Sequence, residues 1–168
     1  MDRDGVINEA QIIDGIPNPP KNVREVRILP GVKKAVQYLK NANYEIIVVT
    51  NQPDIARGKI GLSAVDEINA LLSAQLNITS FYICPHDDGD NCECRKPKSG
   101  LLLTAGNDLD INFEESFMVG DRWRDVAAGQ GVGCKCFFIN HNYTEKLPSL
   151  PYIEVKSLLE ASKMIIKE

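Results

Sequence analysis

The chain is organised around Asp2-Arg3-Asp4-Gly5-Val6, where two carboxylates are separated by one residue and followed by a glycine. The glycine lets the backbone turn, and the paired carboxylates form a compact site for a divalent cation and a phosphorylated substrate. The same pattern is common in solvated turns and in calcium-binding loops. By itself, the stretch therefore leaves open whether it is a turn or a catalytic site.

Three later stretches carry the other groups that phosphoryl transfer to an aspartate requires. They are Val48-Val49-Thr50-Asn51-Gln52, Cys94-Arg95-Lys96-Pro97, and Met118-Val119-Gly120-Asp121-Arg122 together with Asp125. Singly, Thr50 could be an ordinary strand end and Lys96 a surface lysine. Asp121 and Asp125 could cap a helix that begins near Arg122. Their joint occurrence in sequence order, mostly at or just after strand ends, favours a catalytic site.

The length and composition indicate a single domain spanning residues 1–168. With 168 residues, 43% of them hydrophobic, the chain can bury roughly 70% of its unfolded surface. The net charge of −4 argues against binding to nucleic acid or to an anionic membrane. No apolar run is long enough to span a membrane, and the start does not resemble a signal peptide. We therefore expect a cytoplasmic protein without a nucleic-acid or membrane partner. The candidate site described above indicates a small phosphorylated metabolite as its partner, and we expect a monomer.

Short apolar strands alternate with amphipathic helices along the chain. Strands are expected at 45–50, 79–84, 116–119 and 134–139, and helices at about 32–42, 63–76, 101–109, 123–130 and 155–167. Ser63-Ala-Val-Asp66 is a capping pattern for the second helix, and residues 8–30 hold too many prolines for a continuous helix. The run at 45–50 lacks polar alternation, as expected for a strand covered on both faces. The pattern predicts a three-layer α/β fold with a doubly wound parallel sheet and no large cap domain.

The candidate residues can be assigned to the hydrolysis of a phosphate ester through a covalent intermediate. Asp2 is the nucleophile, because a carboxylate is ionised at neutral pH, and Asp4 is the acid and then the base. An all-oxygen site of Asp2, the Asp4 carbonyl and Asp121 suits Mg²⁺. Asp125 can orient a lysine or a metal-bound water. We assign substrate binding to Arg3, Thr50, Asn51, Arg95 and Lys96, and supporting roles to Arg122 and Asp125.

A second site is predicted at Cys84, His86, Cys92 and Cys94. Three thiolates and one imidazole form a closed tetrahedral zinc site with a structural role. In a reducing compartment, cysteines this close together favour metal binding over disulfides. Because Arg95 and Lys96 directly follow the last ligand, zinc would fix their position.

Together these residues resemble the haloacid-dehalogenase superfamily of phosphatases, in the branch of heptose-bisphosphate and histidinol-phosphate phosphatases. The matching stretches are Asp2-Arg-Asp-Gly-Val-Ile-Asn8, Val49-Thr-Asn-Gln52 with Ile55-Ala-Arg-Gly58, Cys94-Arg-Lys-Pro97, and Val119-Gly-Asp-Arg122 with Asp125. The resemblance implies a Rossmann-like fold with strand order 3-2-1-4-5, the magnesium and phosphate roles given above, and the zinc loop. It also implies heptose 1,7-bisphosphate as the substrate, with histidinol phosphate as the alternative. A zinc-stabilised binding module without activity is the alternative from a different class.

One element of the family pattern is missing from the sequence. The pattern places an apolar strand of about five residues before the first aspartate, at the centre of the sheet, whereas only Met1 precedes Asp2. The neighbouring strands would then expose unpaired backbone groups. We therefore expect residues 1–168 to be an N-terminally truncated form that is less stable and less active than an extended one.

Overall fold

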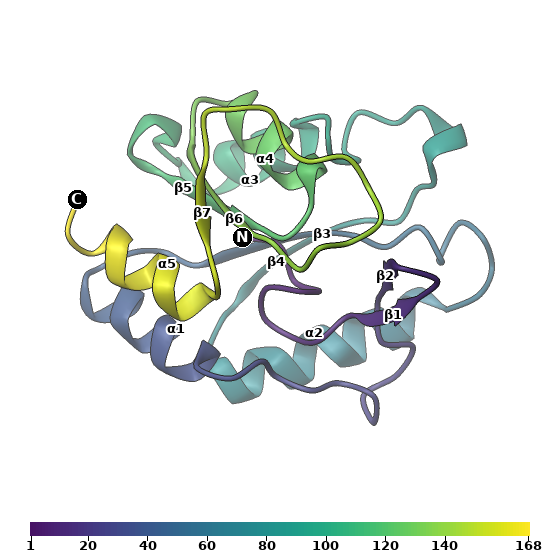
Figure 1. Ribbon diagram of the computed structural model, residues 1–168. Helices are drawn as coiled ribbons and strands as arrows, with labels where there is room; N and C mark the ends of the chain where they lie inside the picture. The colour runs from purple at the N-terminus through teal and green to yellow at the C-terminus, as the bar shows by residue number, and fades with distance from the viewer.

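The computed structural model describes residues 1–168 and contains two parallel sheets between helices, with a small hairpin beside them (Figure 1). The strands are β1 (Gln11–Ile13), β2 (Ile16–Asn18), β3 (Ile47–Asn51), β4 (Ser80–Cys84), β5 (Phe117–Gly120), β6 (Lys135–Ile139) and β7 (Ile153–Val155). The helices are α1 (Val32–Asn41), α2 (Leu62–Leu76), α3 (Gly100–Leu109), α4 (Trp123–Gln130) and α5 (Leu158–Ile165), with short 3₁₀ turns η1 (Asp88–Asp90) and η2 (Phe113–Glu115). No helix is both long and apolar enough to cross a membrane.

The strands of the two larger sheets run parallel. β3 pairs with β4, and β5, β6 and β7 form the second sheet in that order. Met1 and Asp2 lie between the two sheets: the Val49 N–H donates to the Met1 carbonyl and the Asp2 N–H donates to the Val119 carbonyl, each at 2.9 Å. The first aspartate is therefore anchored to both neighbouring strands. The predicted order 3-2-1-4-5 within one continuous sheet stays a prediction.

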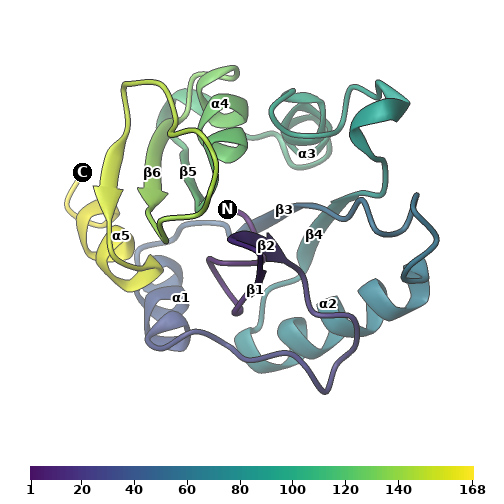
Figure 2. The same cartoon turned by 45° about the vertical axis from the view of Figure 1, so that its right-hand side comes forward.

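Helices cover both faces of these sheets. α1, α2 and α5 pack on one face, and α3 and α4 pack on the other (Figure 2). Consecutive strand residues alternate between the two layers, since Val48 packs in the core with α1, α2 and α5, and Val49 in the core with α3 and α4. Val119 and Met118 alternate in the same way. The expected three-layer α/β fold with parallel strands buried on both faces is confirmed.

The start of α2 differs from the prediction. The helix begins at Leu62, its N-cap is Gly61, and no side chain caps it. The predicted capping role of Ser63 is wrong, because a capping side chain belongs to the residue just before the helix. Ser63 already lies inside the first turn of α2.

The predicted start of the last helix is also wrong. Residues 153–155 form β7 because they pair with β6 and bury Val155 in the core. α5 begins only at Leu158, where the Ser157 hydroxyl accepts a hydrogen bond from the Glu160 N–H at 3.2 Å. A partner strand from elsewhere in the fold thus outweighs the local helical pattern.

The connection at 8–30 contains the antiparallel hairpin of β1 and β2. Asp14 and Gly15 form its turn, with φ of 52° and 75°, and Asp-Gly is a favoured pair for such a two-residue turn. This signal is overlooked when the segment is judged by its prolines alone. The hairpin matters for the site, because Ile16 and Pro17 line the main polar cavity.

Candidate active site

Four predicted site residues meet at the carboxyl ends of the central strands. Asp2, Asp121 and Asp125 place carboxylate oxygens within 4.8 Å of one another, and Lys96 lies among them. All four side chains are buried. Asp121 follows β5 and Asp125 lies in the first turn of α4, so the edge of the sheet brings together groups that are far apart in sequence.

Two glycines permit this close approach. Gly5 has a φ of 82°, and a Cβ at this position would lie 1.9 Å from Asp121 Oδ2. A Cβ at Gly120 would lie 2.1 Å from the Cβ of Asp125. Any larger residue at either position would displace one of the carboxylates.

Lys96 donates to three acceptors at once. Its Nζ lies 2.7 Å from Asp2 Oδ1, 2.6 Å from Asp125 Oδ1 and 2.7 Å from the Val49 carbonyl oxygen. An ammonium has three N–H groups, and these three acceptors occupy all of them. Lys96 therefore acts on the site through its positive charge and by holding Asp2 in place. Burial opposes the charged form, but the carboxylates of Asp125 and Asp2 outweigh burial and raise the pKa of Lys96 above its ordinary value.

The carboxylates fit a bound cation. Burial raises the pKa of Asp2 to about 6, and burial together with the charges of Asp125 and Asp2 raises the pKa of Asp121 well above its ordinary value. Asp121 Oδ1 is buried without a hydrogen-bond partner. Both Asp125 oxygens are engaged, one by Lys96 and one by the Arg122 N–H at 2.9 Å. Oxygens of Asp2 and Asp121 therefore fit Mg²⁺, which takes one or two carboxylates and keeps several waters.

Asp4 lines the same cavity and is held by three side chains. Its carboxylate accepts hydrogen bonds from Arg3 Nε at 3.2 Å and Nη2 at 3.0 Å, and from the amides of Asn8 and Gln52 at 2.8 Å each. Arg3 is 0% exposed and also donates to Asn69 at 2.9 Å. The Arg3 guanidinium is thus enclosed behind Asp4 and positions that carboxylate, and the assignment of Arg3 to substrate binding stays a prediction. Asn8 and Gln52 belong to the motifs quoted above, but a search for charged groups overlooks them.

Thr50 and Asn51, both predicted to bind phosphate, lie at the end of β3. Thr50 is buried, and its hydroxyl accepts from Gln52 at 2.9 Å. Asn51 lines the cavity, and its amide group pairs with the backbone of Lys96 in both directions, at 3.0 and 3.1 Å. Asn51 thus positions Lys96, a role that its place in the sequence does not reveal. The phosphate-binding roles of both residues stay predictions.

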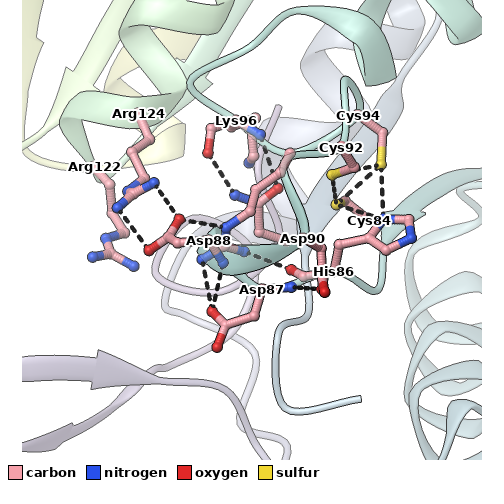
Figure 3. Close-up of polar contacts among 12 residues, drawn as sticks. Cys84, His86, Asp87, Asp88, Asp90, Cys92, Cys94, Lys96, Arg122 and Arg124 are labelled. Carbon is pink, nitrogen blue, oxygen red and sulfur yellow. Dashed lines mark hydrogen bonds and ion pairs between the residues drawn. The ribbon is translucent and has the colours of Figure 1, made fainter. Parts of the chain in front are cut away.

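The four predicted zinc ligands come together at one end of the loop that carries Lys96 (Figure 3). The Sγ atoms of Cys84, Cys92 and Cys94 are 3.1 to 3.7 Å apart. His86 Nδ1 lies 3.3 Å from Cys94 Sγ and 3.8 Å from Cys84 Sγ. Ligand atoms around a tetrahedral zinc with Zn–S bonds of ~2.3 Å are separated by ~3.5 to 3.8 Å. The observed separations, most of them close to this range, fit such an ion.

Arginines and aspartates surround the mouth of the cavity. Only two of its eighteen lining residues are hydrophobic, so the cavity suits a polar ligand. Arg57 contacts Asp87 at 2.7 Å and lowers the pKa of Asp87 to about 2. Arg95 and Arg124 both contact Asp88, at 2.8 and 3.0 Å, so that Asp88 links its own loop, residues 84–96, to α4 (Figure 3). Arg57 lies in a stretch quoted above without an assigned role, and Arg124 shows no signal in the sequence.

Comparison with known proteins agrees with this geometry. Residues 19–133 match the family described as haloacid dehalogenase-like hydrolase. The chain is 33% identical over 141 residues to the D-glycero-beta-D-manno-heptose-1,7-bisphosphate 7-phosphatase of Helicobacter pylori, covering 80% of this chain and 78% of that protein. The corresponding protein of Neisseria meningitidis is 35% identical over 140 residues, covering 80% of this chain and 72% of that protein.

A solved structure resembles the whole chain. It is that of D,D-heptose 1.7-bisphosphate phosphatase from B. bronchiseptica complexed with magnesium and phosphate, with a TM-score of 0.83 and 25% identity. The superposition covers 99% of this chain and 96% of that one. On the match to the family and on these relatives, the chain belongs to the haloacid dehalogenase-like hydrolase family.

Proposed function

We propose that this chain is a magnesium-dependent phosphatase that forms an aspartyl-phosphate on Asp2, with D-glycero-D-manno-heptose 1,7-bisphosphate as its substrate and the 7-phosphate as the group removed. One observation carries the chemistry: a buried carboxylate, Asp2, lies at a polar cavity beside a lysine and a second carboxylate with an unpartnered oxygen, Asp121 Oδ1. The names of the relatives support the choice of substrate.

The residues divide the reaction between them. Lys96 holds Asp2 Oδ1, and an Asp2 oxygen attacks phosphorus while the bond from phosphorus to the sugar oxygen breaks. Asp4 gives a proton to the departing oxygen, and then takes a proton from the water that cleaves the aspartyl-phosphate and releases inorganic phosphate. When bound at Asp2 and Asp121, Mg²⁺ supplies positive charge that offsets the repulsion between the nucleophile and the phosphoryl oxygens. To act as the acid, the Asp4 carboxyl group must carry a proton on an oxygen that now accepts a hydrogen bond from Arg3, Asn8 or Gln52, so one of these hydrogen bonds must break.

The cavity mouth supports a substrate with a second phosphate. Arg57, Arg95 and Arg124 all line the cavity, and guanidinium groups bind phosphate through paired hydrogen bonds. Histidinol phosphate is the second candidate, because its ammonium group would find carboxylates at the same mouth. Asp54 and Asp88 line the cavity there.

Zinc bound by Cys84, His86, Cys92 and Cys94 is part of the proposal. The separations of these four ligand atoms support a tetrahedral ion, and such sites contribute ~10 kcal/mol or more to the order of the surrounding loop. The ion would hold the backbone that leads into Arg95 and Lys96. Its role is structural, because four protein ligands leave no open position for water. The monomeric state expected from the sequence stays a prediction.

The proposed function is tested by phosphate release. Wild-type protein with Mg²⁺ should release phosphate from heptose 1,7-bisphosphate with a higher kcat/KM than from histidinol phosphate or from a heptose monophosphate. Asp2→Asn is the matched control, because an amide is a poor nucleophile and a poorer magnesium ligand. Preference for histidinol phosphate would select the second candidate. Absence of release from every phosphate ester would favour a zinc-stabilised binding module.

A further inference from the structure

The segment 141–145, which follows β6, contacts three separate parts of the molecule. His141 Nε2 lies 2.8 Å from the Gly5 carbonyl oxygen, in the turn that carries Asp2 and Asp4. The Thr144 N–H donates to the Gly15 carbonyl in the β1–β2 turn at 3.0 Å. Glu145 accepts from Arg122, next to Asp121, at 2.6 Å. The segment therefore lies across the site as a strap fixed at several points.

Tyr143 lies in the middle of this strap and contacts the candidate cation site. Its hydroxyl donates to Asp121 Oδ2 at 2.7 Å. This is the only hydrogen bond of the Asp121 carboxylate. The same oxygen faces Gly5, where a Cβ would come within 1.9 Å. With Oδ2 held between Tyr143 and Gly5, the carboxylate cannot rotate freely, and Oδ1 is left without a partner.

We propose that Tyr143 is a positioning residue for the cation, which acts by holding Asp121 Oδ2 so that Oδ1 is directed to the ion. The proposal rests on the proposed function, because it requires a cation at Asp2 and Asp121. Hydrogen bonds to the ligand of a metal fix the orientation of that ligand, and their loss commonly weakens metal binding. The strap explains why a residue outside any helix or strand can do this: the His141 and Tyr143 rings lie 5.4 Å apart, and the flanking contacts hold both in place.

The test is a calorimetric titration of Mg²⁺ into wild-type protein, Tyr143→Phe and the control Tyr152→Phe, each dialysed free of Mg²⁺. Tyr152 packs edge-on against Phe138, 5.5 Å between ring centroids, and is not among the residues that line the cavity. We expect Tyr143→Phe to weaken Mg²⁺ binding by about tenfold or more and Tyr152→Phe to leave it unchanged. At saturating Mg²⁺, phosphate release by Tyr143→Phe should return toward the wild-type rate, because the nucleophile is untouched.

Each outcome decides the proposal. The melting temperatures without Mg²⁺ control for folding, because loss of the only hydrogen bond to the buried Asp121 carboxylate lowers that of Tyr143→Phe modestly. The positioning role is read from the Mg²⁺ dissociation constant at a temperature where all three proteins are folded. An Mg²⁺ dissociation constant unchanged by Tyr143→Phe would overturn this inference and leave the proposed function intact. A variant that does not fold would also overturn it, because Tyr143 would then be a core residue. A wild-type protein that binds no Mg²⁺ would overturn the magnesium part of the proposed function as well.

Discussion

The ammonium of Lys96 lies 2.7 Å from Asp2 Oδ1, although 94 positions separate the two residues in sequence. The same nitrogen lies 2.6 Å from Asp125, and Asp121 is the third buried carboxylate of the group. One buried positive charge therefore faces three carboxylates. The excess negative charge makes the site complementary to a divalent cation, and it makes the lysine a support of the fold as well as of the reaction.

Replacing Lys96 by Met should lower the free energy of unfolding by about 3 to 5 kcal/mol at neutral pH, because breaking a buried ion pair leaves charge uncompensated. Urea denaturation measures this loss. Lys98→Met is the matched control, since Lys98 is an exposed lysine on the same loop that pairs with Glu93. Equal losses in the two variants would show that Lys96 does not compensate the carboxylates.

The stabilisation by Mg²⁺ should depend on pH. The pKa of Asp2 in the folded, metal-free protein is about 6, above the ordinary value of 3.8. The folded protein thus holds the Asp2 proton more tightly than the unfolded chain does, so protonation of Asp2 stabilises the metal-free fold. This stabilisation is fully present below the ordinary pKa of 3.8 and is lost as the pH rises through about 6. Because Mg²⁺ requires the ionised carboxylate, we expect it to raise the melting temperature more at about pH 7.5 than at about pH 5. An increment independent of pH would contradict this.

Asp4→Asn should slow hydrolysis of an alkyl phosphate by ~10²-fold or more, the usual contribution of a positioned acid. An activated aryl phosphate needs no protonation of its leaving group and should lose less. Rates on both substrates, measured with the same preparation, separate this effect from a folding defect caused by losing the contact with Arg3. Equal losses on both would argue against the acid role.

Cys92→Ser should lose zinc, loosen residues 85–96 and lower activity by displacing Lys96, while Mg²⁺ binding at the carboxylates is retained. Metal analysis and limited proteolysis measure the first two effects. Cys134→Ser is the control, because Cys134 lies outside the four-ligand cluster. A well-folded wild-type protein that is purified without chelator and contains no zinc or equivalent metal would refute the four-ligand site.

Arg124→Gln should raise the KM for a bisphosphate by about tenfold, the equivalent of about 1.4 kcal/mol of lost binding, and should change the KM for a monophosphate little. The reason is that Arg124 lines the mouth of the cavity and does not contact the carboxylates where the reaction occurs. Arg24→Gln, an exposed arginine away from the cavity, is the control. Equal changes on both substrates would remove Arg124 from recognition of a second phosphate.

The sequence was enough to predict the layers of the fold and which charged side chains come together at the candidate site. Strand and helix periodicity are local properties, so the buried run of β3 and the helices α1, α3 and α4 could be placed from the sequence. The carboxyl ends of parallel strands meet at one edge. For this reason Asp121, which follows the predicted strand at 116–119, could be expected near Asp2, which the family pattern places at the same edge. The cluster of Cys84, His86, Cys92 and Cys94 could be expected as well, because all four residues lie within a short stretch.

The directions of the polar side chains and the meeting of distant segments depend on the tertiary structure. Arg3 follows Asp2 directly, yet it turns into the interior and holds Asp4. β7 exists because β6 offers it a partner, and no local pattern predicts that pairing. Tyr143 reaches Asp121 from a segment without helical or strand periodicity. Such contacts depend on the path of the whole chain, since the groups involved gain their stabilisation from neighbours that are remote in sequence.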